Sequence, residues 1–201
     1  MAAEASPRFA AVGAGRMGRG IAVAFAYAGH RIALIDLRPR DETAWTRLRH
    51  EAVAEIRAHA QALARLGALA DAQVDALCDR VSLIPAPGAA KALARAELVF
   101  EGVAETLEAK RDAFAQISHH LRDDAILTST TSSILVTDLA PLVSKPERFL
   151  NMHWLNPAYL IPVVELSTHP LTDADVLACT RTWMESIGKL PVVCGPAPGY
   201  I

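Results

Sequence analysis

Cysteine is scarce in this chain of 201 residues. Its three cysteines, Cys78, Cys179 and Cys194, lie far apart and form no Cys-x-x-Cys pair. Such spacing argues against a zinc site and against a framework of disulfide bonds. It fits a protein kept in a reducing compartment, so we expect a cytoplasmic location.

Charge of one sign and long apolar runs are scarce as well. The formal net charge is only -2, which gives no general field to attract nucleic acid or an anionic membrane. No apolar run reaches the roughly 18 residues that a membrane-spanning helix needs. The N-terminal Met-Ala-Ala-Glu-Ala-Ser-Pro lacks the basic start of a secretion signal. We therefore expect a small-molecule substrate as partner, and neither nucleic acid nor a membrane.

Hydrophobic residues are abundant, at 52% of the chain against 21% charged residues. This composition is typical of a globular protein that buries one core. Short apolar runs typical of strands are separated by segments with helical periodicity. Strands are predicted at 9–12, 31–35, 81–84, 98–103, 125–128, 149–153 and 163–166, and helices near 21–28, 43–66, 71–78, 109–121 and 173–187.

This alternation predicts an α/β fold, a Rossmann-like, doubly wound and mostly parallel sheet with helices on both faces. Segments 43–66 and 71–78 follow the second strand as a pair of helices, with Asp71 as the cap of the second one. This helical pair is predicted as an insertion into the simple alternation of strands and helices.

The first predicted strand leads into a glycine-rich turn, Gly13-Ala-Gly-Arg-Met-Gly18, at the start of a helix. In a dinucleotide-binding unit Gly13 permits the tight turn, Gly15 lets the backbone approach the pyrophosphate, and Gly18 lets the helix pack closely. The helix N-terminus then faces the anion. The candidate cofactor-binding residues in this turn are Gly13, Gly15, Arg16, Met17 and Gly18.

A carboxylate at the end of the second strand supports this interpretation, since a glycine-rich turn alone also occurs in ordinary strand-to-helix connections. Asp36 lies where an acidic side chain accepts hydrogen bonds from the adenosine ribose and repels the 2'-phosphate of NADP, which favours NAD. Arg38 and Arg40 keep NADP open as the alternative, because arginines beyond this strand can neutralise a phosphate. Exposed loop arginines are more often solvated.

A histidine near a later strand end is the candidate acid or base. His153 is expected at the carboxyl end of its strand, the edge at which open α/β sheets bind ligands. Glu165 lies on the next strand-like run, and the turn at Asn156-Pro157 can bring the two side chains together. The carboxylate would then fix one imidazole tautomer. A histidine among apolar residues is otherwise more often a hydrogen-bonded core residue.

Taken together, four stretches of the chain resemble the NAD-binding N-terminal domain of the L-3-hydroxyacyl-CoA dehydrogenase family, and the resemblance runs from residue 9 to residue 201. The stretches are Val12-Gly-Ala-Gly-Arg-Met-Gly-Arg-Gly-Ile21 with Leu34-Ile-Asp36, Phe100-Glu-Gly-Val-Ala-Glu105 with Lys110, Ser129-Thr-Thr-Ser-Ser133, and Met152-His-Trp-Leu-Asn-Pro157 with Val163-Val-Glu-Leu166.

The resemblance implies roles for individual residues. His153 would be the general base that takes the proton of the substrate 3-hydroxyl, and Glu165 would orient it. Ser132 would bond the substrate oxygen, and Asn156 would lie on the nicotinamide and substrate side of the cleft. Glu105 and Lys110 would contact the cofactor near the nicotinamide ribose. Without the family, Ser132 is equally well a helix cap before Ile134, and Lys110 a solvated helix lysine.

Several positions depart from the family pattern. Thr130 stands where the family usually has asparagine, and Trp154-Leu155 replaces two phenylalanines. Pro157-Ala-Tyr-Leu-Ile-Pro162 resembles members that oxidise free hydroxy acids, such as gulonate and carnitine dehydrogenases. The helical insertion is basic, with Arg47, Arg49, Arg57 and Arg65, although Glu51 and Glu55 share its surface. The family resemblance implies an acyl-CoA substrate of fatty acid metabolism, and these departures keep a free 3-hydroxy acid as the alternative.

The segment at the end of the sequence resembles the start of a second domain. In the family a helical C-terminal domain follows a Gly-[Phe/Tyr]-Ile-x-Asn motif, and the chain ends in Gly199-Tyr-Ile201. We expect residues 1–195 to form the NAD-binding domain and 196–201 to begin the linker to a helical domain absent from this chain. A homodimer is expected only with that domain. A non-catalytic NAD-binding or structural protein remains the alternative of a different class.

Overall fold

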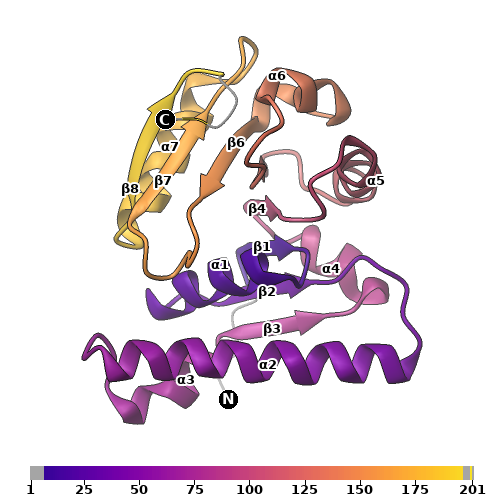
Figure 1. Ribbon diagram of the computed structural model, residues 1–201. Coiled ribbons are helices and arrows are strands. Elements are labelled where there is room, and N and C mark those ends of the chain that lie inside the picture. Colours follow the sequence, from indigo (N-terminus) through magenta and orange to yellow (C-terminus); the bar gives the residue numbers. More distant parts are fainter. Residues whose placement is uncertain (1–6, 197–199, 201) are drawn as a thin grey trace.

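An eight-stranded sheet forms the centre of the computed structural model, which describes residues 7–196 and Tyr200. Its strand order is β3-β2-β1-β4-β5-β6-β7-β8 (Figure 1). The strands are β1 (Phe9–Val12), β2 (Ile32–Ile35), β3 (Val81–Ile84), β4 (Leu98–Glu101), β5 (Ile126–Ser129), β6 (Phe149–Trp154), β7 (Val163–Ser167) and β8 (Leu190–Cys194). The pairing of β6 with β7 is antiparallel and every other pairing is parallel. The predicted Rossmann-like, mostly parallel sheet is confirmed.

Helices cover both faces of the sheet. They are α1 (Arg16–Tyr27), α2 (Glu42–Arg65), α3 (Val74–Cys78), α4 (Ala89–Leu93), α5 (Leu107–Ser118), α6 (Val136–Leu139) and α7 (Ala174–Ser186), with short 3-10 turns at Asp71–Gln73, Ala86–Gly88, Ala140–Leu142 and Pro146–Arg148. Alternation of side chains along each strand divides the core in two. Phe9 and Ala11 belong to the core under α1, α2, α3 and α7, and Ala10 and Val12 to the core under α4, α5 and α6.

The helical pair after β2 is present, with one correction at its second member. Asp41 caps α2 by accepting a hydrogen bond from the amide of Ala44 at 2.7 Å, and Ile56, Ala60 and Leu63 of its apolar stripe are buried. Asp71 was expected to cap a helix that runs to Cys78. Instead Asp71 is the first residue of a 3-10 turn, and α3 begins only at Val74.

Strand β8 is missing from the sequence-based expectation. Its sequence, Leu-Pro-Val-Val-Cys, is short and contains Pro191, which cannot donate to a strand ladder. The strand lies at the end of the sheet order and, among the described strands, pairs with β7 alone, and an edge strand tolerates such a proline. None of the helices described by the structure has the length and apolarity required to span a bilayer.

The close packing of α1 on the sheet depends on Gly18. A Cβ atom at this position would lie 2.0 Å from the carbonyl oxygen of Gly13 and 3.1 Å from the side chain of Leu34. The backbone oxygen cannot yield cheaply, so the side chain of any other residue would push the helix away from the sheet.

We predict that Gly18→Ala lowers the free energy of unfolding by about 1–3 kcal/mol, the usual cost of overpacking. Gly195→Ala serves as the control because a Cβ there meets nothing within 4 Å, and we expect it to change stability by less than about 0.5 kcal/mol. Urea denaturation of both variants measures the difference. Equal midpoints would show that α1 does not depend on this close approach.

Candidate active site

The glycine-rich turn lies at the carboxyl end of β1 and opens into a cleft of about 490 Å³. Gly13 has a φ of +105°, and a Cβ there would lie 2.5 Å from the carbonyl oxygen of Gly102. Beside Gly15, by contrast, the space where a Cβ would lie is open. The cleft is lined by the turn, by the segment after β2 and by residues 102–104 after β4.

The N-terminus of α1 supplies hydrogen-bond donors to this cleft. Gly15 is the N-cap residue and no side chain caps the helix, so the first-turn amides are available for an anion. Arg16 and Met17 are the first residues of the helix and line the cleft. Three further arginines also line it, Arg19, Arg38 and Arg40. An open space at Gly15, free helix amides and nearby arginines fit the pyrophosphate of a dinucleotide.

Asp36 lies just beyond β2 in the same cleft and is only 5% exposed. Arg40 donates from its Nε to the Asp36 carboxylate, four residues along the chain. Both loop arginines are exposed, as expected, and Arg40 is in addition paired with Asp36. Arg40 contacts Oδ2 of Asp36 and partly balances its negative charge.

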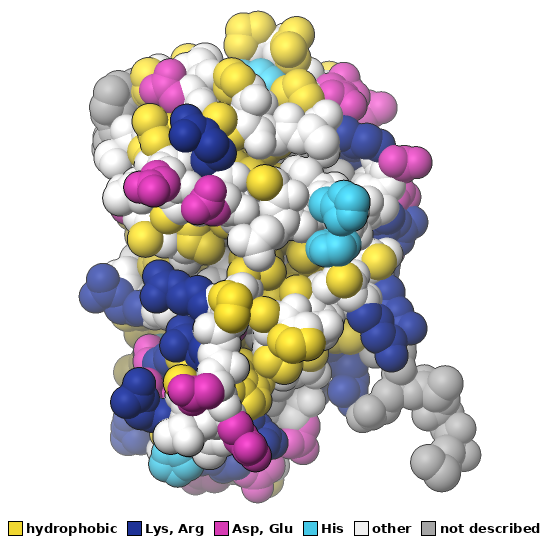
Figure 2. Space-filling view, turned by 90° about the vertical axis from the view of Figure 1, so that its right-hand side faces the viewer, with side chains coloured by type: hydrophobic (Ala, Val, Ile, Leu, Met, Phe, Trp, Pro, Cys, Tyr) yellow, Lys and Arg dark blue, Asp and Glu magenta, His cyan; other side chains and the backbone are white. Residues whose placement is uncertain are grey.

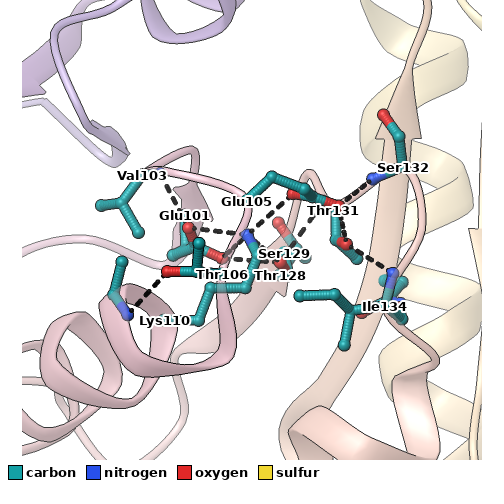
Figure 3. Close-up of polar contacts among 12 residues, drawn as sticks. Glu101, Val103, Glu105, Thr106, Lys110, Thr128, Ser129, Thr131, Ser132 and Ile134 are labelled. Atoms are coloured by element: carbon teal, nitrogen blue, oxygen red, sulfur yellow. Dashed lines mark hydrogen bonds and ion pairs between the residues drawn. The ribbon is translucent and has the colours of Figure 1, made fainter.

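A buried lysine joins the ends of β4, β5 and α5 (Figure 3). The Nζ of Lys110 lies 2.9 Å and 3.1 Å from the two carboxylate oxygens of Glu101 and 3.3 Å from the hydroxyl of Ser129. The side chains of Lys110 and Glu101 are both fully buried. The interpretation of Lys110 as a solvated helix lysine is therefore wrong. Its ammonium group lies behind the cleft lining and does not face solvent.

Glu105 extends this network toward the loop after β5. One oxygen of its carboxylate accepts hydrogen bonds from the hydroxyl of Thr131, the amides of Ser132 and Ser133, and the hydroxyl of Ser133. The other oxygen lies 3.5 Å from Lys110. Burial raises the pKa of Glu105, but these hydrogen bonds and the lysine outweigh it, so the pKa falls below its usual value. Glu105 is thus an anion that fixes the loop carrying Ser132.

His153 connects this loop with β7. The Nδ1 of His153 lies 2.5 Å from a carboxylate oxygen of Glu165, and its Nε2 lies 3.0 Å from the hydroxyl of Ser132. The two residues face each other in the antiparallel register of β6 and β7, where directly opposed side chains are neighbours. A carboxylate beside Nδ1 leaves the proton there and the lone pair on Nε2. Ser132, His153 and Glu165 therefore form the chain of contacts expected of a general base.

The alternative reading of Ser132 as a helix cap is wrong. The amide of Ile134 donates its hydrogen bond to the hydroxyl oxygen of Thr131, at 3.0 Å, and α6 begins at Val136 with Leu135 as the N-cap residue. Asn156 is exposed, three residues beyond His153 at the start of the loop between β6 and β7. Its predicted place beside the nicotinamide and substrate stays a prediction.

Sequence reasoning missed three residues of this site. Glu101 and Ser129 end the adjacent strands β4 and β5, and a polar residue that closes an apolar run was the available signal for them. The third is Tyr200, whose ring stacks on that of His153. Its position next to a strand 47 residues away is a tertiary contact that no local pattern in the sequence indicates.

Positive and negative charges are mixed on one side of the molecule, the side toward which β1 and β3 point. Figure 2 shows this side, with a band of hydrophobic side chains across its middle and basic and acidic side chains interspersed around the band. No half of the view carries one sign of charge alone. This side of the molecule therefore supplies no general field for a phosphate group, and only the local donors of the cleft would attract one.

We predict that Lys110→Met lowers the free energy of unfolding by about 3–5 kcal/mol, because it leaves the Glu101 carboxylate buried without a counter-charge. Lys91→Met is the matched control, since Lys91 is exposed on α4, and we expect a change below about 0.5 kcal/mol. Chemical denaturation compares the two variants. Similar stabilities would contradict a central role for the buried ion pair.

The chain is similar in sequence to known dehydrogenases. Residues 8–197 match the family described as 3-hydroxyacyl-CoA dehydrogenase, NAD binding domain. The chain is 35% identical over 192 residues to 3-hydroxyadipyl-CoA dehydrogenase of Escherichia coli (strain K12), covering 96% of this chain and 38% of that protein. It is 32% identical over 193 residues to 5-formyl-3-hydroxy-2-methylpyridine 4-carboxylate 5-dehydrogenase of Mesorhizobium japonicum, covering 96% and 59%.

Solved structures show the same fold. The crystal structure of (S)-3-hydroxybutyryl-CoA dehydrogenase from Ralstonia eutropha superimposes with a TM-score of 0.85 at 28% identity, covering 98% of this chain and 66% of that one. The chain thus spans less than two thirds of these relatives. Its family follows from the match over nearly all of its length: the chain belongs to the NAD-binding domain family of the 3-hydroxyacyl-CoA dehydrogenases.

Proposed function

We propose that this chain is the NAD-binding part of a dehydrogenase that oxidises an L-3-hydroxyacyl-CoA to the 3-oxoacyl-CoA, with His153 as the general base. The observation that carries the proposal is the contact chain from Glu165 through His153 to Ser132. These three residues lie at the same edge of the sheet as the nucleotide cleft, in the loop after β5 and on β6 and β7. Residues 102–104 line that cleft, and Glu105, next in sequence, binds the Ser132 loop.

The proton chemistry follows from the two hydrogen bonds of the imidazole. With its Nδ1 proton donated to Glu165, the Nε2 lone pair of His153 is free to accept a proton. The Ser132 hydroxyl lies 3.0 Å from Nε2, so a substrate hydroxyl that replaces Ser132 as the donor to Nε2 would lie beside the Ser132 hydroxyl. Ser132 then donates to the substrate oxygen, while the Glu165 carboxylate stabilises the imidazolium that forms.

Bound NAD would supply the acceptor for the hydride that leaves C3 of the substrate. The chain contributes the binding groups: Gly13, Gly15 and the α1 amides for the pyrophosphate, and Asp36 for the adenosine ribose. We propose Glu105 and Asn156 as the residues nearest the nicotinamide end. Lys110 acts in this scheme through Glu105, because its ammonium group is buried among Glu101, Ser129 and Glu105.

Dehydrogenation of a substrate without CoA is the second candidate function. A relative that is 32% identical has a name that refers to a substituted pyridine carboxylate and not to a CoA ester. Other relatives carry the names of 3-hydroxyadipyl-CoA dehydrogenase and of the alpha subunit of the fatty acid oxidation complex. We favour the CoA ester. A purely structural role is disfavoured, because the base, its carboxylate and the serine are all in contact.

The substrate class is tested by NADH consumption with acetoacetyl-CoA and with free acetoacetate. We expect turnover with the CoA ester, and a kcat/KM lower by at least about tenfold, or 1.4 kcal/mol, with the free acid. The assay uses the chain itself and the chain extended as its relatives are. Faster turnover of acetoacetate would favour the second candidate, and inactivity with every 3-oxo substrate would contradict both enzyme functions.

For His153 we predict that His153→Gln slows hydride transfer by about 10²- to 10⁴-fold, the usual contribution of a general base, with little change in NAD affinity. The matched control is His119→Gln, because His119 is exposed at the end of α5. Stopped-flow oxidation of NADH measures the step, and fluorescence titration measures binding. An unaltered rate in the His153 variant removes this residue from the mechanism.

For Asp36 we predict that Asp36→Ala weakens NAD binding about 10- to 100-fold, as expected for loss of hydrogen bonds to a charged group. The substitution also reduces the preference of the protein for NAD over NADP, since Arg40 loses its carboxylate partner. Asp79→Ala is the control, because Asp79 is exposed just before the amino end of β3, whereas Asp36 follows the carboxyl end of β2. Calorimetric titration measures the affinities of both variants and of the wild type for NAD and for NADP. A wild-type protein that prefers NADP would contradict the assigned role of Asp36.

A further inference from the structure

Tyr200 contacts the ring of the proposed base directly. Its ring centroid lies 4.6 Å from that of His153, and the two ring planes are inclined by only 9°. This is a stacked pair, in which the phenol ring covers one face of the imidazole. The nitrogens of His153, in the plane of its ring, are already bonded to Glu165 and Ser132. The imidazole is therefore held at both nitrogens and on one face.

The phenol hydroxyl ties Tyr200 to the serine loop. It donates to the carbonyl oxygen of Thr131 at 2.9 Å, one residue before Ser132. Burial raises the pKa of this phenol well above its usual value, so the group stays protonated and remains a donor. Tyr200 also has a φ of +60°, a conformation that residues with a Cβ rarely adopt and that persists only where surrounding contacts stabilise it.

Two contacts of one side chain thus join the base to the loop that carries its partner. When the substrate hydroxyl takes the place of Ser132 at Nε2, the hydrogen bond to Glu165 alone leaves the imidazole free to tilt out of its plane. A ring stacked on one face opposes that tilt and keeps water from this face. The Thr131 contact fixes the phenol relative to Ser132, so the distance between the base and the serine is maintained.

We propose that Tyr200 is a positioning residue that holds the His153 ring in the plane that directs Nε2 at the substrate hydroxyl. This inference rests on the proposed function, since it concerns the same proton transfer. Tyr200 does not itself move a proton. It acts through the orientation of His153 and through the loop of Ser132.

Two substitutions separate the stacking from the hydroxyl contact. Tyr200→Phe keeps the ring and removes the donor to Thr131, whereas Tyr200→Leu removes both. Tyr27→Phe is the matched control, because the Tyr27 hydroxyl also donates to a backbone carbonyl, that of Ala68, at the same distance of 2.9 Å. Tyr27 is 42% exposed and lies at the end of α1, away from His153.

We expect Tyr200→Leu to slow hydride transfer about 10- to 100-fold, the effect of a small misplacement of a reacting group, with the KM for NAD changed by less than about twofold. Tyr200→Phe should retain most of the rate, and Tyr27→Phe all of it. A wild-type rate in Tyr200→Leu would overturn the proposal. Equal losses in the Phe and Leu variants would also overturn it, because the hydroxyl and not the stacked ring would then be responsible.

A spectroscopic measurement tests the stacking without any substrate. The ring current of Tyr200 should shift the carbon-bound protons of His153 upfield, and these resonances are identified by their loss in His153→Gln. We expect the shift in wild type and in Tyr200→Phe and its loss in Tyr200→Leu. An unshifted wild-type spectrum would overturn the proposal. If the wild type turns over no substrate, the proposed function fails, and this spectrum alone decides whether Tyr200 holds the ring.

Discussion

The buried ion pair between Lys110 and Glu101 is the contact on which the arrangement of the site depends. It joins α5 to the end of β4, and the Ser129 hydroxyl adds the end of β5. A charge that is removed from water must find its partner with good geometry, so the three elements have little freedom relative to one another. Such a pair contributes little net stability, but its loss is costly. Glu105, which also faces Lys110, is therefore presented to the Ser132 loop at a fixed position.

The reversal of strand direction between β6 and β7 divides the sheet edge into two chemical halves. On the parallel side, β1, β2 and β4 end together and their loops form the cleft with free helix amides. On the other side, the antiparallel register places Glu165 opposite His153. The two halves are adjacent because Glu105, in the loop after β4, accepts hydrogen bonds from the loop after β5. Tyr200 adds a contact from a distant part of the chain to the second half.

Features that depend on local chemistry were predictable from the sequence. The turn through Gly13 and Gly18 requires close backbone approach, which only glycine allows, and the structure shows both approaches. The apolar periodicity of α2 likewise gave its buried face. The sequence did not predict β8 because it contains Pro191, and a proline argues against a strand unless the strand is known to lie at an edge. Lys110 was equally ambiguous, since a lysine on a helix is usually solvated and only the fold supplies its buried partners.

The sequence by itself therefore determined the alternating architecture, the nucleotide turn, and the pairing of His153 with Glu165 as a hypothesis that the register of β6 and β7 then made specific. The tertiary structure alone decided that Arg40 bonds Asp36, that Glu105 accepts hydrogen bonds from residues 131–133, and that Tyr200 stacks on His153. The physical reason is the range of the interactions. Backbone conformation and side-chain periodicity are local, whereas burial, counter-charges and ring stacking depend on residues that only folding brings together.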